Sequence, residues 1–564
     1  MAQNQPCDPL FPDPRDNLPP GTFRLIQDED ERGQGNRQVM LNPVPSSDPN
    51  EPLNWSTARK ICNFTLVLAV TALIFTALSI QAIFWQLMVV DLDVTYAQLN
   101  RAMSVNFVGL AVGCVFFIPL AKKFGRRPVY LVSTALMLAT SFWTSKLQTL
   151  AELYATNLLQ GLAGATNESI VQITISDLFF VHHRGGMNGL YMTMVMIGSF
   201  LTPMAAGTQA TNQGWRASYQ ALGITNAVLF VLFVLFYEET KYTPVIPGVD
   251  ESCEHTVDNI KADRKRDIEC SASRAETSPI PADHHELDYR IPMRTWRQRF
   301  ALITYTPESI WPYFYRPFYV VASFPAVFFC ALQYAFGVVW LTILSSTLSL
   351  VFPLPPYLFT SEQIGFMSVG PFIGNLIGSV YGGFLGDWSI LFFSKRNKGY
   401  YEPEMRLYIL HLPALTMAGG LIMFGATIAR GMHWIYPSIG GALFGFGLGS
   451  ISDASLTLVI DSYRDVSISL YHYLSMRPEY TFSRVFLKQI TGDAFTGVAF
   501  MRNAISIGIP FAISPWLDRS GAQNMFIACG FISLAITFTI IPMVIWGKRM
   551  RRATAERYRI MAGK

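Results

Sequence analysis

Charge is scarce in this chain of 564 residues. Asp, Glu, Lys and Arg make up 15% of it, whereas soluble domains usually carry about 25% charged residues. Apolar residues reach 51%, and they gather in runs of about 20, each long enough to cross a bilayer as a helix. This distribution excludes a string of soluble domains and predicts an all-α polytopic membrane protein. The net charge of +4 is too small to indicate nucleic-acid binding.

Cysteine and histidine are also few. The seven cysteines show no CxxC or paired spacing, so we expect neither a disulfide framework nor a metal site. A membrane-embedded enzyme would need clustered ligands or a nucleophile with its base, and the sequence indicates neither. A Walker A sequence is missing as well, which argues against direct use of ATP. We therefore expect no enzymatic activity and no cofactor.

Two sets of six apolar spans are expected. They lie near 61–84, 101–121, 128–147, 151–179, 186–208, 217–237, 317–345, 364–388, 407–429, 434–459, 491–514 and 523–546. Between the sets, residues 239–316 are charged and rich in Ser and Pro, and we predict a mostly disordered cytosolic linker. The plan is a tail (1–58), a first half (59–238), the linker, a second half (317–547) and a second tail (548–564).

Positive charge falls in alternate loops. The linker, the segment 122–127 and the segment 395–398 are rich in Lys and Arg, whereas the loop 346–361 has none. Because positively charged loops stay on the cytosolic side, both tails are predicted to be cytosolic in a multi-pass protein of the cell membrane. The polar segment 1–58 does not resemble a cleavable signal peptide, so the first span is expected to act as the insertion signal.

The loop after the second span has the sequence Ala-Lys-Lys-Phe-Gly-Arg-Arg-Pro. Its notable residues are Lys123, Gly125, Arg126 and Arg127. Taken alone, a tight turn carrying a positive-inside anchor explains them equally well. A degenerate copy with Gly383 and Asp387 lies at the end of the eighth span, before Lys395 and Arg396. Two copies half a chain apart indicate a duplicated transporter.

This loop resembles the signature of the major facilitator superfamily, G-x3-D-[RK]-x-G-R-[RK]. Lys122 occupies the family's aspartate position, so the acidic latch that the family builds here is expected to be missing from the first half. In the fifth span, Gly198, Pro203 and Gly207 resemble the family's antiporter motif. Ordinary close packing of helices is the alternative explanation for these small residues.

Other motifs are similar to those of fungal drug:proton antiporters, in the branch that includes polyamine and organic-cation permeases. They lie at 48–55, 214–216, 238–240 and 402–406. The resemblance implies twelve transmembrane helices in two six-helix halves and proton-coupled export of small organic compounds by alternating access. Proton-coupled uptake of polyamines or other organic cations is the alternative, and a non-transporting sensor is a third interpretation. The expected partners are the lipid bilayer, protons and a small organic substrate, and we expect a monomer.

Glu168 stands near the middle of the fourth span. Charges at that depth are costly and usually functional. The family's arginine in this span would fall at Asn157, so Glu168 has no cation in its own helix, and burial without a partner would favour its protonated form. We expect it, with Asn167, to bind a proton or a cationic substrate; a structural carboxyl is the alternative. Gln81, Trp85 and Asn106 are candidates for the same cavity, where aromatic rings suit an organic cation.

Asp453 in the tenth span and Arg502 in the eleventh are the other deep charges. Consecutive spans run antiparallel, so we expect these two to form a gating or structural ion pair. Asp177 and Asp493 fall near cytosolic helix ends and are expected to be solvated or to cap helices. Glycines at every fourth position from Gly370 to Gly386 predict a smooth groove for a partner helix.

The segment Val466–Gln489 separates two motifs that similar transporters join almost directly. It begins with Val-Ser and ends with Gln, whose codons can supply the borders of a fungal intron of 72 nucleotides, the coding length of these 24 residues. A retained intron and a genuine insertion both remain open.

If the segment is an intron, sequencing the messenger RNA across this junction will find a transcript that lacks the 72 nucleotides. A sole transcript that keeps all of them would show a genuine insertion. Chain entropy does not distinguish the two, because each doubling of a loop costs only about 0.6 kcal/mol.

Overall fold

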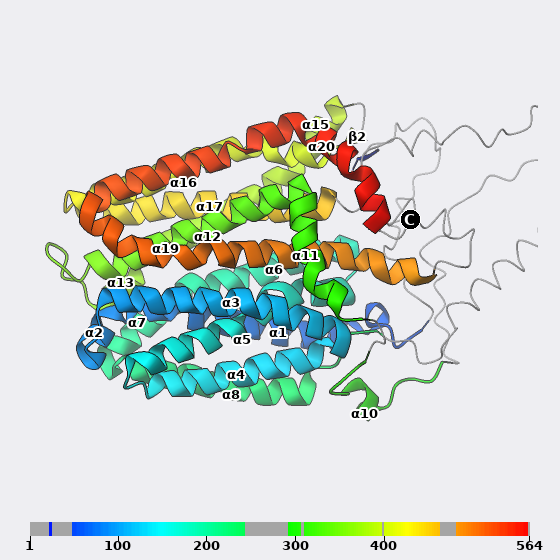
Figure 1. Ribbon diagram of the computed structural model, residues 1–564, viewed down its shortest axis with the longest axis horizontal. Helices are drawn as coiled ribbons and strands as arrows, with labels where there is room; N and C mark the ends of the chain where they lie inside the picture. Colours follow the sequence, from blue (N-terminus) through cyan, green and yellow to red (C-terminus); the bar gives the residue numbers. More distant parts are fainter. Residues whose placement is uncertain are drawn as a thin grey trace, which may run out of the picture.

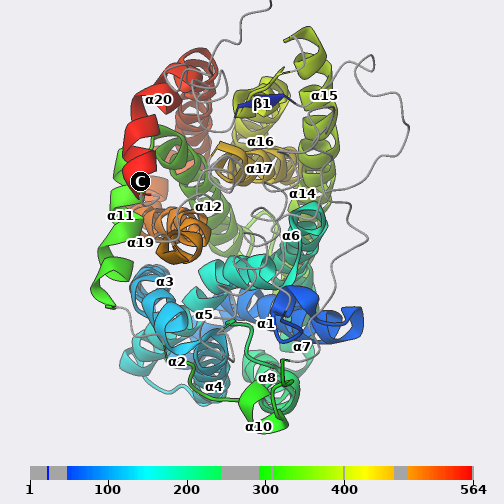
Figure 2. The same cartoon turned by 90° about the vertical axis from the view of Figure 1, so that its right-hand side faces the viewer.

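Helices dominate the computed structural model, which describes residues 22–24, 48–242, 291–305, 309–397, 400–462 and 481–561. Long helices run side by side along one axis, with the blue-to-teal part of the chain beside the green-to-red part (Figure 1). The view along this axis separates the same two groups (Figure 2). Among the described residues, β1 (Phe23–Arg24) and β2 (Tyr400–Tyr401) form one short antiparallel ladder.

The first half contains the helices that precede the linker. They are η2 (Pro52–Asn54), α1 (Thr57–Ile83), α2 (Trp85–Leu92), α3 (Tyr96–Phe124), α4 (Arg126–Ser145), α5 (Leu150–Leu178), α6 (Val181–Met196), the π-helical turn η3 (Ile197–Leu201), α7 (Thr202–Gln213) and α8 (Trp215–Phe236). Thr95 and Thr149 begin α3 and α5 with capping boxes, which satisfy backbone N–H groups that a helix start leaves unpaired.

The second half contains the helices that follow the linker. They are α10 (Trp296–Arg299), α11 (Trp311–Ser323), α12 (Pro325–Val351), α13 (Ser361–Phe366), α14 (Val369–Val380), η5 (Tyr381–Leu385), α15 (Gly386–Arg396), η6 (Pro403–Leu410), α16 (His411–Ala429), α17 (Ile435–Ser462), α19 (Thr481–Thr537) and α20 (Ile540–Met561). Gly521, with φ 71°, turns the chain inside α19, so that this stretch contains two helices.

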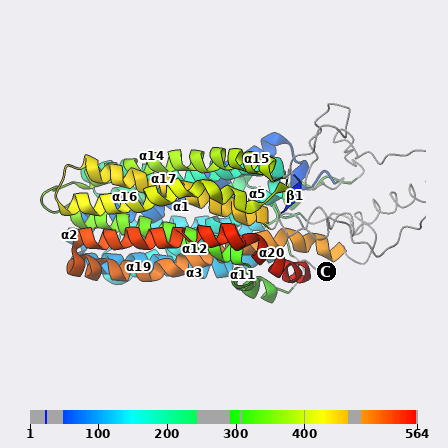
Figure 3. The same cartoon turned by 90° about the horizontal axis from the view of Figure 1, so that it is seen from above.

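The apolar helices agree with the expected membrane fold. Nine helical stretches of the described residues are long and apolar enough to span a bilayer, and one of them, Gly492–Arg557, includes the turn at Gly521. Helices α4 and α5 are outside these nine but pack against each other in the same bundle, and α5 lies among the long helices in Figure 3. The all-α architecture in two halves is therefore confirmed.

Three expected boundaries change. The seventh span does not begin at residue 317, because the chain breaks at Phe324, where an extended residue precedes Pro325; a residue before proline disfavours the helical conformation. Both ends of the linker are ordered: Glu239 N donates to the Arg299 carbonyl at 3.2 Å. Residues 243–290 lie outside the described part. Residues 463–480 also lie outside the described part. The eleventh span was expected to begin near residue 491, but α19 begins at Thr481, inside the suspected insertion.

The ends of the bundle are distinct. We call the end with segments 48–56 and 237–242 and the last turns of α20 the tail end, and the opposite end, with α2 and residues 352–360, the loop end (Figure 1). The two halves meet where α3 packs against α19 and where α7 packs against α13. The expected glycine groove is confirmed: Gly374 and Gly378 lie against the α17 backbone at Ala442 and Phe446.

Candidate functional site

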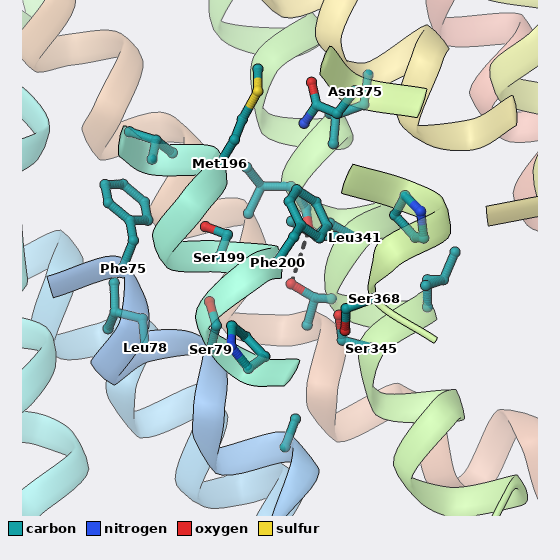
Figure 4. Close-up of a pocket in the computed structure, with 18 of the residues that line it drawn as sticks. Phe75, Leu78, Ser79, Met196, Ser199, Phe200, Leu341, Ser345, Ser368 and Asn375 are labelled. Atoms are coloured by element: carbon teal, nitrogen blue, oxygen red, sulfur yellow. Dashed lines mark hydrogen bonds between the residues drawn. The ribbon is translucent and has the colours of Figure 1, made fainter. Parts of the chain in front are cut away.

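A cavity of about 210 Å³ lies between the two halves. Its wall is formed by α1, α3, α5 and η3 from the first half and by α12, α14, α17 and α19 from the second. Apolar side chains such as Phe75, Met196 and Phe200 face Leu341 and Asn375 across it (Figure 4). A predominantly apolar wall with a few polar groups is typical of a site for a small organic molecule.

An ion pair joins the two halves at this cavity. Arg502 on α19 donates through Nη2 to Oε1 of Glu168 on α5, and their side chains are only 6% and 4% exposed. In such a poorly solvated place, opposite charges attract far more strongly than in water. This electrostatic attraction between the halves requires Glu168 to carry its negative charge.

Neighbouring polar groups orient this pair. Asn503 Nδ2 donates to Glu168 Oε2 at 2.7 Å, while Arg502 Nε donates to the Asn503 side-chain oxygen at 3.2 Å. From α12, the Tyr334 hydroxyl accepts from Arg502 Nη1 at 3.2 Å. Cys114 Sγ on α3 lies 3.9 Å from Glu168 Oε2. Sequence reasoning missed Tyr334, Asn503 and Cys114; the one signal was that Asn503 follows an intramembrane arginine.

The expected pair between Arg502 and Asp453 is wrong. Glu168 has no cation partner in its own helix, but it is not buried without one, because Arg502 reaches it from α19. Sequence adjacency favoured partners within one half, but the contact between α5 and α19 brings together residues 334 positions apart. Asp453 also lines the cavity. Within the described residues, Asp453 forms no ion pair.

Most of the other cavity candidates are in place. Gln81, Trp85 and Asn106 line the cavity with Glu168. Among the described groups, Gln81 Nε2 and Trp85 Nε1 are buried donors without a hydrogen-bond partner, and such donors remain available to a bound molecule. Asn167 does not line the cavity; its Oδ1 accepts from Thr71 on α1 at 3.0 Å.

The signature loop is tied to the end of α8. Gly125, at φ 110°, leaves room for Glu239, whose carboxylate accepts from the backbone N–H groups of Arg126 at 2.9 Å and Arg127 at 3.1 Å. A carboxylate at this position satisfies the start of α4. Arg126 also pairs with Asp177 at 3.1 Å, so Asp177 is not simply solvated. The loop thus fastens α3, α4, α5 and α8 together.

Lys122 provides a second ion pair between the halves, at the tail end. Its Nζ pairs with Asp493 on α19, and their side chains are 8% and 3% exposed. The expectation that Asp493 is solvated or capping is therefore wrong. Lys122 occupies the position of the family's aspartate. The first half therefore contributes the cation of this ion pair, where the family signature would contribute a carboxylate. Lys123 instead lies 5.2 Å from the centre of the Tyr305 ring.

The antiporter-like motif packs closely on two sides. Gly198 lies against the α1 backbone at Ala72, within the first half. At the loop end, a methyl added at Gly207 would lie 2.6 Å from the Ser361 carbonyl, and the Pro203 carbonyl meets Gly365. These small residues therefore let α7 approach α13 of the other half. In the second signature copy, Gly383 faces open space, and the Asp387 side chain lies outside the described part.

Comparisons with known proteins agree with this architecture. The family model described as Major Facilitator Superfamily matches residues 67–476. An uncharacterized MFS-type transporter of Schizosaccharomyces pombe is 28% identical, with 92% of this chain and 89% of that protein covered. The MFS antiporter QDR3 of Candida albicans is 24% identical over 84% of this chain and 75% of its own length. The proton:xylose symporter XylE superposes with a TM-score of 0.55 and 10% identity, covering 87% of this chain and 97% of its own.

The Glu168–Arg502 pair predicts coupled mutational effects. Glu168→Gln or Arg502→Gln alone leaves one buried charge unpaired and should cost about 3–5 kcal/mol of stability in detergent, while the double variant should recover much of the loss. Asp453→Asn combined with Arg502→Gln is the matched control and should be closer to additive. An additive loss at Glu168 and Arg502 would contradict the pairing.

The tail-end bridge predicts charge reversal. Lys122→Asp places a carboxylate against Asp493 and should lower thermal stability, and adding Asp493→Lys should restore much of it, because the opposite charges meet again. Lys123→Asp, one residue along, is the control and should have a smaller effect. Failure of the reversed pair to recover stability beyond Lys122→Asp would rule out the bridge.

Proposed function

Since the chain belongs to the Major Facilitator Superfamily and is a membrane transporter, we propose that it exports small organic compounds in exchange for protons. The observation that supports this proposal is the ion pair between Glu168 and Arg502. Glu168 is a titratable carboxylate, its contact with Arg502 connects the two halves, and both residues line the cavity.

Protonation of Glu168 supplies the coupling. A neutral carboxyl no longer attracts the Arg502 guanidinium, so the α5–α19 contact weakens and the halves can rock relative to each other. Transfer of the proton to the opposite side restores the carboxylate and reforms the bridge. In transporters built from repeats, the site lies near the bilayer midplane at the interface between the repeats, and the cavity of this chain is lined by residues of both halves.

The cavity favours a cationic organic substrate. Glu168 and Asp453 contribute two carboxyl groups to its wall against the single cation Arg502. The rings of Phe75, Trp85 and Phe200 provide faces for an organic cation. In the proposed cycle, substrate entering from the cytosol displaces the proton from Glu168, and extracellular protons reload it.

We place the tail end in the cytosol and the protein in the cell membrane as a monomer. Lys122, Lys123, Arg126 and Arg127 gather at the tail end, as expected for a cytosolic face. This orientation makes the loop-end contact between α7 and α13 the extracellular closure.

The test uses the full chain in sealed vesicles with an imposed proton gradient and a panel of fluorescent organic cations and polyamines. We expect proton-driven movement opposite to the proton flux, which Glu168→Gln should reduce by at least about tenfold by removing the titratable group. Glu556→Gln, the same change at an exposed position of α20, should leave transport intact.

The direction of flux separates the alternatives. Movement of substrate with the protons would identify an uptake permease, the second candidate, which the same acidic and aromatic cavity also suits. Wild-type pH dependence in the Glu168→Gln variant would show that this carboxyl does not couple transport.

A further inference from the structure

Helix α11 differs from its neighbours in direction. It lies across the long helices near the tail end (Figure 1), on the outer side of α19 and α3 (Figure 2). Since the long helices are the ones apolar enough to span the membrane, a helix that crosses them runs along the membrane and not through it. The break at Phe324–Pro325 separates it from α12. The expected boundary at residues 316 and 317, between the linker and the seventh span, falls inside α11.

One face of α11 packs on both halves. Tyr313, Pro317 and Val320 are buried at a helical spacing. Towards the first half, the Phe314 ring meets Phe116 of α3 edge-on at 6.4 Å, and Lys122 lies 5.2 Å from the Tyr313 ring. Towards the second half, the Phe318 ring meets Phe500 of α19 at 4.8 Å. The helix therefore crosses the joint beside the Lys122–Asp493 bridge.

The opposite face is aromatic and exposed. Trp311 is 73% exposed, Tyr315 60% and Tyr319 48%, at positions i, i+4 and i+8. Just upstream, Leu302, Ile303 and Tyr305 are also exposed beside the end of α3. We call these six residues the aromatic stripe. The three rings of α11 share one helix face, and an exposed apolar face of this kind marks a contact with a partner.

We propose that the aromatic stripe binds lipids at the boundary between headgroups and acyl chains in the leaflet at the tail end. Phe116, which touches α11, is 54% exposed on the outer surface of the membrane-spanning helix α3, so the stripe continues a surface that already faces lipid. Trp and Tyr combine an apolar ring with a polar atom, and they are enriched at this depth of a bilayer.

Lipid binding at this face has a structural consequence. Because α11 contacts α3 and α19 at once, lipids that hold α11 in the surface also fix the line along which the two halves meet. The segment is then an anchor at the joint between the halves, whereas a disordered linker would leave them connected only loosely.

Tryptophan fluorescence tests the proposal on the full chain in nanodiscs that hold one copy each. The spectrum of Trp311→Phe is subtracted from that of the wild type, which isolates Trp311 and keeps an aromatic ring in place. Quenching is measured with phospholipids carrying a nitroxide near the headgroup, with phospholipids carrying it at the chain end, and with iodide in water. Trp340, 2% exposed, gives the buried reference through Trp340→Phe.

We expect the headgroup-proximal nitroxide to quench Trp311 at least about twofold more than iodide or the chain-end nitroxide, as interfacial residues should. Tyr315→Gln with Tyr319→Gln should reduce this difference, and Tyr436→Gln, at an exposed tyrosine of the loop end, should not. Strongest quenching by iodide would place the stripe in water and overturn the proposal. If Trp311 were protected from every quencher only in nanodiscs that hold two copies, the stripe would bind a second copy of the chain. That result would also overturn the proposal of lipid binding.

Discussion

The buried ion pair between Glu168 and Arg502 joins the two halves of this protein at the wall of the cavity. Each charge is buried in a place where it would be costly alone, so each requires the other half to be in position. The same requirement makes the contact sensitive to a single proton on Glu168. In the proposed cycle, one pair of side chains therefore contributes both to the cohesion of the halves and to their response to protons.

Three kinds of contact join the halves along the bundle axis. At the loop end, Gly207 allows α7 to approach the α13 backbone; in the middle, the ion pair adjoins the cavity; at the tail end, Lys122 meets Asp493. Close packing of small residues needs a fixed distance between backbones, whereas ion pairs depend on charge. A proton on Glu168 therefore acts directly on the middle contact, whereas the loop-end packing carries no titratable group at Gly207.

The signature loop and α11 act on the same joint from outside the cavity. Glu239 and Gly125 fix the loop that carries Lys122, and Tyr313 of α11 lies beside that lysine. The position of the tail-end bridge therefore depends on the order of both linker ends, which the composition of residues 239–316 did not predict. Charged and Ser/Pro-rich sequence lowers the average tendency to fold, but short segments with aromatic residues can still pack on a preformed surface.

The sequence by itself determined the membrane-spanning character, the division into two halves and the loop motifs, because length and hydropathy act locally along the chain. It also located Glu168, Asp453 and Arg502, since charges in apolar spans are conspicuous. Only the tertiary structure decided that Arg502 meets Glu168 and not Asp453, that Lys122 meets Asp493, and that Tyr334 and Asn503 support the central pair. The Arg502–Glu168 and Lys122–Asp493 contacts connect residues hundreds of positions apart on opposite halves, and no local pattern of hydropathy or spacing encodes which helices face each other across the interface.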